Sequence, residues 1–146
     1  MRIYFARPIS GCTPQEVQLY YKMILSHPDL IQYEKFIPFV ENEIIRTDEP
    51  FRASGYDGLA SDHAIYERDK WFAEHCDILL VNLLGSKSKS IGCMFELVWA
   101  KKANAHTLVI MEPNNPHYHA FVLQAADMVF ATFEDAISYL KTFKKY

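Results

Sequence analysis

Two carboxylates stand where a helix would otherwise be apolar, and they are the first candidates for chemistry. Glu96 is the only ionisable carboxylate in the run from Ser90 to Ala100. Helical side chains lean towards the N-terminus of their helix, so Glu96 leans over Gly92, which has no side chain to block it. An exposed helix edge without a function would normally carry more polar residues. We therefore expect a partly buried carboxylate with a raised pKa, a recurrent feature of catalytic sites.

Asp69 is the second candidate, because it lies on the core side of its helix. The apolar residues at helical spacing around it are Ile65, Phe72, Ala73 and Cys76. A buried carboxylate needs partners, so Asp69 either serves a pocket or bonds to nearby backbone or to Arg68 as a structural residue. Asp77 is expected instead to open the next strand at its amino end, away from any site.

The start of the Glu96 helix is a candidate anion site. Ser90, Ile91 and Gly92 follow a serine-rich turn, and free backbone N–H groups at the positive end of a helix dipole suit a phosphate. The alternative is an ordinary N-cap serine that holds no ligand.

Metal, thiol and P-loop chemistry have weaker support. His117 and His119 have the spacing of half a metal site, but no partner set is evident, and we predict neither a metal ion nor an organic cofactor. Cys12 and Cys93 have no identifiable base partner. The turn at Gly11 lacks the further glycines and the lysine of a P-loop.

Short apolar runs alternate with helical patterns, which is typical of a parallel sheet with crossover helices. The predicted strands are 2–6, a segment within 33–40, 78–83, 107–111 and 128–132. The first predicted helix starts at a capping box (Thr13, Pro14, Glu16). Further helices are predicted at about 62–76, 90–103, 119–126 and from 134 onwards. The expected buried stripes are Val17, Tyr20, Tyr21 and Ile24 in the first helix, and Ile91, Met94, Phe95 and Val98 in the helix of Glu96. Residues 41–61 are predicted to form a long loop.

The expected fold is therefore α/β, a three-layer sandwich around a five-stranded parallel, flavodoxin-like doubly wound sheet. We expect residues 1–146 to form a single domain. In such sheets, ligands bind beyond the carboxyl ends of the strands.

Composition limits the partners. The formal net charge of −3 argues against a nucleic acid polymer, because phosphate neutralisation needs clustered Lys and Arg. No apolar run reaches the roughly 20 residues that span a bilayer, and Arg2 and Arg7 interrupt the apolar stretch at the N-terminus, so we expect neither a membrane span nor a signal peptide. The three cysteines have no CxxC spacing, which favours reduced thiols and a cytoplasmic protein.

Three blocks of the sequence, taken together, carry a resemblance to a known family. They are residues 3–11, residues 68–69 with 76–81, and the Glu96 block at residues 90–100. They resemble the nucleoside 2-deoxyribosyltransferase family and its relatives that hydrolyse deoxynucleoside monophosphates. The Glu96 block is the most specific, because a glutamate there follows a Ser or Asp and a glycine.

The resemblance implies roles for individual residues. Glu96 would be the nucleophile, Asp69 would contact the sugar or orient the glutamate, and Tyr4 would line the pocket. With Tyr4, the residues that we expect to bind substrate are Arg7, Ile9, Ser10, Gly11, Ser90, Gly92 and His119. His119 lies in a segment, residues 116–120, that in the family completes the active site of a neighbouring subunit, so the resemblance also implies a homo-oligomer, at least a dimer.

Two departures from the family pattern concern the 5′ group of the substrate. Arg7 stands where many relatives carry glycine, and Ser10 stands where some nucleotide hydrolases carry arginine. Ser90 conversely fits the nucleotide hydrolases, since the nucleoside transferases more often carry aspartate there.

Three hypotheses follow for the small-molecule chemistry. In the first, Glu96 forms a covalent sugar ester and a second base accepts the sugar of a deoxynucleoside. In the second, water accepts the sugar of a deoxynucleoside 5′-monophosphate, with Ser90, Arg7 and Ser10 around the phosphate. In the third, the chain is an idle nucleotide-binding or sensor module that keeps the fold.

Overall fold

The computed structural model describes residues 1–38 and 49–143, which form five strands and five α-helices. The strands are β1 (Arg2–Ala6), β2 (Glu34–Phe36), β3 (Ile78–Asn82), β4 (His106–Ile110) and β5 (Met128–Phe130). The helices are α1 (Pro14–Ser26), α2 (Asp62–His75), α3 (Ile91–Lys102), α4 (Ala120–Ala125) and α5 (Phe133–Leu140). Short 3-10 turns η1 (Pro28–Leu30), η2 (Gly58–Ala60) and η3 (Lys141–Phe143) complete these elements.

The five strands make one parallel sheet in the order β2-β1-β3-β4-β5. This is the predicted flavodoxin-like order, and the predicted fold class is confirmed. The second strand is shorter than its predicted window and covers Glu34–Phe36. Of the predicted long loop, residues 41–48 lie outside the described residues, and the described part is irregular apart from η2.

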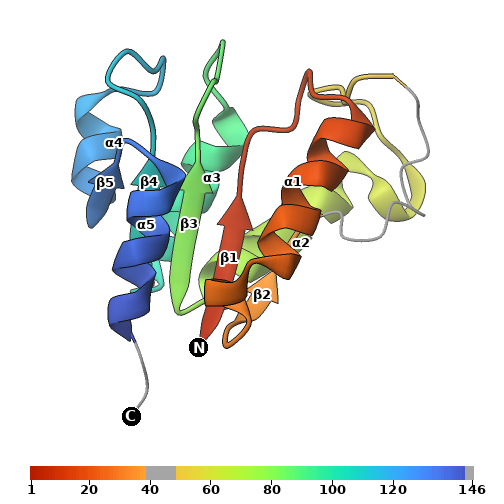
Figure 1. The fold of residues 1–146 in the computed structure, drawn as a ribbon. Helices are drawn as coiled ribbons and strands as arrows, with labels where there is room; N and C mark the ends of the chain where they lie inside the picture. Colours follow the sequence, from red (N-terminus) through yellow and green to blue (C-terminus); the bar gives the residue numbers. More distant parts are fainter. Residues whose placement is uncertain (39–48, 144–146) are drawn as a thin grey trace.

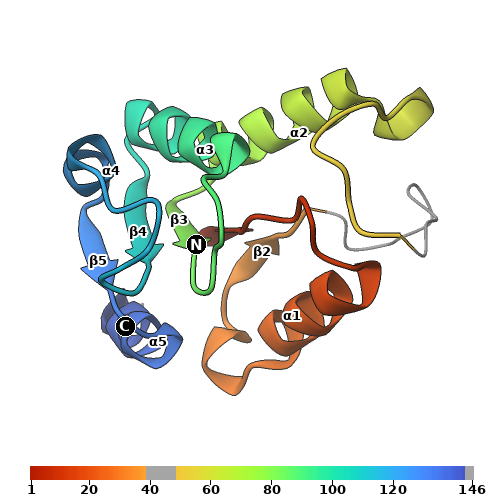
Figure 2. The ribbon, with the colours of Figure 1, turned by 90° about the horizontal axis from the view of Figure 1, so that it is seen from above.

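Helices cover both faces of the sheet, so the molecule has three layers (Figures 1 and 2). Helices α1 and α5 lie on one face, and α2, α3 and α4 lie on the other. Successive side chains of a strand point to opposite faces of the sheet, so alternate residues pack into two separate cores. On β1, Ile3 and Phe5 pack towards α1 and α5, whereas Tyr4 and Ala6 pack towards α2 and α3. No helix among the described residues has the length and apolar character to cross a membrane.

The first helix forms as its sequence predicts. Thr13 accepts a hydrogen bond from the Glu16 N–H, and the Glu16 side chain accepts one from the Thr13 N–H, which makes a full capping box. The predicted stripe is buried as well; its members are Val17, Tyr20, Tyr21 and Ile24.

The predicted buried stripe of α3 is wrong. Ile91, Phe95 and Val98 are 74%, 50% and 57% exposed, and Met94 is only half-buried. The buried residues of α3 are instead Cys93, Glu96, Leu97 and Ala100. The helix is apolar on both faces, so periodicity alone cannot choose the inner one. This rotation turns Glu96 inwards, so its carboxylate is more deeply buried than the partly buried position that the sequence predicts.

Candidate functional site

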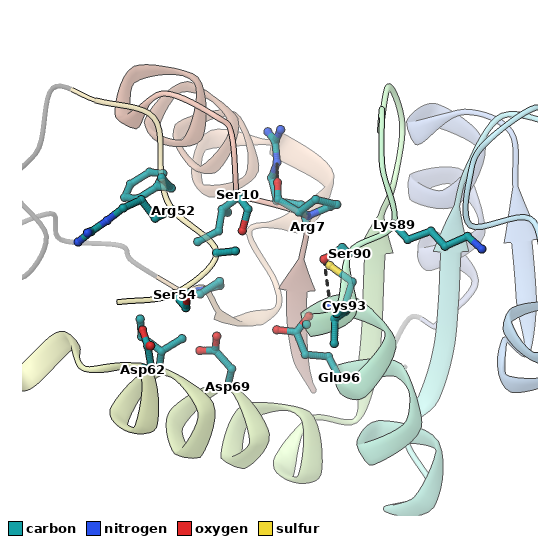
Figure 3. Close-up of a pocket in the computed structure, with 18 of the residues that line it drawn as sticks. Arg7, Ser10, Arg52, Ser54, Asp62, Asp69, Lys89, Ser90, Cys93 and Glu96 are labelled. Carbon is teal, nitrogen blue, oxygen red and sulfur yellow. Dashed lines mark hydrogen bonds between the residues drawn. The ribbon is translucent and has the colours of Figure 1, made fainter. Parts of the chain in front are cut away.

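A cleft of about 550 Å³ opens beyond the carboxyl ends of β1 and β3, where ligands bind in doubly wound sheets (Figure 3). Its walls come from four segments: the turn after β1, the segment 51–56 with Pro38, the inner face of α2, and the start of α3. The lining residues include Arg7, Ile9 and Ser10 from the first, Arg52, Ser54 and Tyr56 from the second, Asp62 and Asp69 from the third, and Ser88, Ser90, Gly92, Cys93 and Glu96 from the fourth.

Glu96 is the buried acid of this cleft. It is 7% exposed, and its Oε1 accepts a hydrogen bond of 2.5 Å from the Tyr4 hydroxyl. Tyr4 is fully buried and lies behind Glu96 rather than among the lining residues, so the expectation that Tyr4 lines the pocket is corrected. Its contact with Glu96 is what brings the middle of β1 into the site.

Asp69 points into the same cleft from the neighbouring helix α2 (Figure 3). Its side chain is 16% exposed, and Oδ1 accepts a hydrogen bond of 3.2 Å from Arg68 Nε. The sequence offered a pocket role and a bond to Arg68 as alternatives, and the structure contains both. Asp77 lies elsewhere, at the amino end of β3, where it accepts a bond from the Arg2 N–H.

Both carboxyl groups have raised pKa values, and the charge of Asp69 opposes the ionisation of Glu96. Burial is the main cause that raises the pKa of Glu96 to about 7, the charge of Asp69 adds to it, and hydrogen bonds from Tyr4 and Cys93 lower it in part. Burial also raises the pKa of Asp69 to about 6, against the lowering effect of Arg68. Tyr4, whose pKa burial and Glu96 raise well above its ordinary value, stays a neutral hydrogen-bond donor. The site therefore holds an acid that changes charge near neutral pH.

Two backbone N–H groups that the sequence suggested for binding an anion already donate to acceptors within the protein. The Gly11 N–H donates to the Phe51 carbonyl, and the Ser90 N–H donates to His117 Nε2. Gly11 does not line the cleft, and its φ of +84° is one that glycine adopts without strain. The Ser90 hydroxyl caps α3 by accepting from the Cys93 N–H, so the first-turn amides of Ile91 and Gly92 are the ones that this helix end still offers.

Arg7 lines the cleft but also has partners of its own. Its guanidinium lies over the Tyr20 ring, 4.7 Å from the centroid, and Nε donates to the Pro8 carbonyl. Ile9 and Ser10 follow it on the same wall. The structure thus brings together Glu96, Asp69, Ser90 and Gly92 with Arg7, Ile9 and Ser10 around one cleft.

Residues 51–56, called the roof below, line the cleft except at Gly55. The sequence predicted a loop here but identified none of its residues individually. Phe51 forms two backbone hydrogen bonds with the turn after β1. The Gly11 N–H donates to the Phe51 carbonyl (2.7 Å), and the Phe51 N–H donates to the Cys12 carbonyl (2.9 Å). The Asp62 carboxylate accepts from the N–H groups of Gly55 and Tyr56. A long polar stretch with glycines was the available signal, and it predicted a loop without its contacts.

Comparison with solved structures shows the same architecture over almost the whole chain. A CMP N-glycosidase from Clostridium botulinum is 13% identical, with a TM-score of 0.58, covering 98% of this chain and 100% of that one. A 2-deoxyribosyltransferase from Leishmania mexicana is 19% identical, with a TM-score of 0.65 and 99% of both chains covered. A 2-deoxyribosyltransferase from Bacillus psychrosaccharolyticus is 14% identical, with a TM-score of 0.67, covering 95% of this chain and 92% of that one. This chain has the fold of these enzymes.

Sequence comparison adds no functional information, because no family model matches the chain and no curated protein matches it. The shared fold places Glu96 and Asp69 in the crevice where a doubly wound sheet binds its ligands. Among the described residues, no three His, Cys, Asp or Glu side chains are grouped as a metal site requires.

His119 is another predicted site residue that does not line the cleft of Glu96. It is exposed and lines a second, largely apolar cavity of about 340 Å³ between α3 and α4, together with Val98, Phe121 and Val122. The sequence expectation was that this segment acts on a neighbouring subunit, and that expectation stays a prediction.

Proposed function

We propose that the chain cleaves or exchanges the N-glycosidic bond of a 2′-deoxynucleoside, with Glu96 as the nucleophile. The observation that carries the proposal is the Glu96 carboxylate itself, which is buried, faces a cleft of small-molecule size, and is held at one oxygen by Tyr4. A carboxylate with these surroundings is poised for covalent chemistry at a sugar carbon.

The first step uses the ionised form of Glu96. Tyr4 holds Oε1, so Oε2 attacks C1′ while the C1′–N bond breaks and its electron pair leaves with the base, which takes up a proton from water. The transition state resembles an oxocarbenium ion, and the product is a sugar ester of Glu96. Asp69, on the facing helix, accepts a hydrogen bond from a sugar hydroxyl and keeps the glutamate turned towards C1′.

The second step decides between transfer and hydrolysis. A second nucleobase attacks C1′ from the side that the first base left, or water does, and the ester oxygen returns to Glu96. Both outcomes retain the configuration at C1′, as double displacement requires. No step in this scheme calls on a metal ion or an organic cofactor.

The structural neighbours support this class of reaction. One is named for the N-glycosidic cleavage of CMP and two for 2-deoxyribosyl transfer, and all three share the sheet and helices that carry Glu96 here. The resemblance of residues 90–100 to the catalytic block of the nucleoside 2-deoxyribosyltransferase family points to the same glutamate. We therefore assign the chain to this family as part of the proposal.

A nucleotide substrate is the second candidate, and the residues that line the cleft favour it. They include three serines (Ser10, Ser88 and Ser90) and two arginines (Arg7 and Arg52). With the free amides at the start of α3, these donors suit a 5′-phosphate. The proposed substrate is then a deoxynucleoside 5′-monophosphate, and water is the acceptor.

One assay separates these possibilities from an idle binding module. The protein is incubated with each deoxynucleoside and each deoxynucleoside 5′-monophosphate, with and without a free acceptor base, and products are separated by chromatography. Formation of a new nucleoside supports transfer, and base release without an acceptor supports hydrolysis. Ligand binding in calorimetry with no turnover of any substrate would contradict the enzymatic proposal and favour the idle module.

We also propose that the protein is a homo-oligomer whose neighbouring subunit supplies His119. The support is the exposed segment around α4, where Tyr118 and Phe121 are 58% and 80% exposed. Light scattering at micromolar concentration should give at least a dimer mass, and His119→Ala should then weaken substrate binding. A fully active monomer would contradict both parts.

A further inference from the structure

His117 is a buried imidazole that lies outside the cleft and contacts the start of the catalytic helix. It is 1% exposed and belongs to the connection between β4 and α4. Its Nε2 atom accepts a hydrogen bond of 2.7 Å from the Ser90 N–H. The proposed reaction makes no use of this side chain, yet Ser90 is the N-cap of the helix that carries Glu96.

The surrounding hydrogen bonds define the tautomer of this imidazole. Since Nε2 accepts from a backbone N–H, it carries no proton. The ring proton is therefore on Nδ1, which donates to Asn115 Oδ1 at 2.8 Å. The amide of Asn115 is oriented in turn, because its Nδ2 donates to the Leu83 carbonyl at 2.7 Å and its Oδ1 also accepts from the His117 N–H. His117 is thus a neutral imidazole with both nitrogens engaged.

Residues 112–117 hold both ends of the connection between β3 and α3. At the β3 end, Asn115 binds the Leu83 carbonyl and the Glu112 carboxylate accepts from the Gly85 N–H at 3.2 Å. At the α3 end, His117 binds Ser90. The connection between these two points supplies the cleft wall at Ser88 and Lys89, and the first turn of α3 follows it directly.

We propose that His117, kept as the Nδ1–H tautomer by Asn115, is a positioning residue that sets the start of α3 and through it the place of Glu96 in the cleft. The part of this inference that concerns catalysis rests on the proposed function. The tautomer and the hydrogen bond to Ser90 do not.

The same geometry makes the contact sensitive to acid. Burial lowers the pKa of His117, the charge of Lys89 lowers it further, and Glu112 raises it in part. Lys89 belongs to the β3–α3 connection and Glu112 to the segment after β4, so charges of opposite sign from two segments act on the ring. A proton on Nε2 would point at the Ser90 N–H, and two donors cannot bond to each other. Protonation therefore releases the start of α3.

Matched variants test the positioning role. His117→Gln keeps an acceptor near the Nε2 position and cannot gain a proton, whereas His117→Leu keeps the bulk and leaves the Ser90 N–H without its partner. We expect His117→Leu to lower kcat/KM about tenfold and His117→Gln to stay within about threefold of the natural protein. His117→Gln should also remove one ionisation from the acid side of the pH profile. The control is His75→Gln at the exposed end of α2, which should change neither quantity.

Nitrogen-15 NMR of the imidazole gives a readout that needs no turnover and no substituted protein. The expected spectrum is that of an Nδ1–H tautomer with a pKa below the ordinary histidine value, and the Ser90 amide signal should move at the same pH as the ring. An Nε2–H tautomer, or a Ser90 amide that ignores the titration, would overturn the inference. So would equal activity of His117→Leu and His117→Gln in an active enzyme. If the proposed reaction is absent, the NMR result still decides the tautomer and the contact.

Discussion

Two carboxyl groups at opposite ends of the sheet have pKa values shifted in opposite directions. At the amino end, Asp127 accepts hydrogen bonds from Lys101 and from the N–H and hydroxyl of Thr107. Burial works to raise its pKa, but the bonds from Lys101 and Thr107 outweigh burial and lower the pKa to about 2. Asp127 is therefore charged at every physiological pH, and its charge fastens β4 to the start of β5.

At the carboxyl end, Glu96 receives weaker support. Burial, and then the charge of the nearby Asp69, raise its pKa to about 7, and the hydrogen bonds from Tyr4 and Cys93, both neutral, offset this only in part. Burial raises the pKa of both carboxylates; the comparison teaches that a charged donor and backbone donors reverse this effect at Asp127, whereas two neutral donors do not reverse it at the more deeply buried Glu96. An anion that the protein does not fully solvate is destabilising in the free enzyme, and it gains by forming a bond to a substrate.

Replacing the reactive carboxylate should give the largest effect. Glu96→Gln preserves the shape and the Tyr4 contact but removes the nucleophile, so we expect the rate of base release to fall by roughly a thousandfold or more. Asp127→Asn, at the other end of the sheet, is the control and should keep its activity. Residual activity of more than about a few per cent in a clean Glu96→Gln preparation would contradict the nucleophile assignment.

Asp69→Asn should have the next largest effect, because it changes both the sugar contact and the charge beside Glu96. We expect kcat/KM to fall by roughly tenfold to a hundredfold. Removing the Asp69 charge lowers the pKa of Glu96, so the acid side of the pH–rate profile should move to lower pH. Thermal melts run beside the kinetics distinguish a structural role, since a stability loss of about 3 kcal/mol or more would indicate a broken buried pair.

Tyr4→Phe should move the same profile in the other direction. The Tyr4 hydroxyl stabilises the ionised form of Glu96, so its loss raises the pKa of that carboxyl. At pH 7 we expect about a tenfold drop in activity, largely recovered at higher pH where Glu96 ionises again. A profile that keeps its shape and position would show that the 2.5 Å contact does not tune the nucleophile.

The smallest effects are expected in how protein stability depends on pH, and the contributions of Glu96 and Asp127 should have opposite signs. The folded pKa of Glu96, about 7, lies above its ordinary 4.5, so the unfolded chain loses this proton first and stability falls as pH rises between these values. The folded pKa of Asp127, about 2, lies below its ordinary 3.8, so its contribution is present above pH 3.8 and is lost as pH falls towards 2.

Denaturant unfolding of two variants measures these contributions. At pH 8, Glu96→Gln should raise the free energy of unfolding by about 1–3 kcal/mol, and the gain should vanish near pH 4.5, the ordinary value for a glutamate. Asp127→Ala should lower it by about 1–2 kcal/mol at pH 8. Destabilisation of both variants at pH 8 would mean that Glu96 is held as firmly as Asp127.

The fold could be predicted because its signals are local. The capping box at Thr13 and Glu16 starts α1, and its predicted apolar stripe is the face that is buried, although the exposed side also carries Leu19 and Leu25. Helix α3 lacks such a signal, since its outer face carries Ile91, Phe95 and Val98. Counting apolar residues there favours the wrong face, because the buried face includes the ionisable Glu96.

The site could be predicted only where one residue broke a local pattern. Glu96 and Asp69 are out of place on their own helices, and the sequence identified both. The Tyr4 contact joins residues far apart in the chain, and an apolar strand gives no sign that one hydroxyl on it will meet a carboxylate. His117 was noticed for its spacing to His119, whereas its actual partners, Ser90 and Asn115, depend on how two connections pack together.

The paired hydrogen bonds between Phe51 and the turn at Gly11 and Cys12 have a consequence for access to the cleft. They join the roof to the wall opposite α2, so this side of the cleft widens only when both bonds break together. The amide protons of Gly11 and Phe51 then exchange with deuterated solvent only from the separated form, so their slowing reports the free energy of that separation. Mass spectrometry of the peptides that contain them thus measures how much of the resting protein has this side of the cleft open, before any substrate is known.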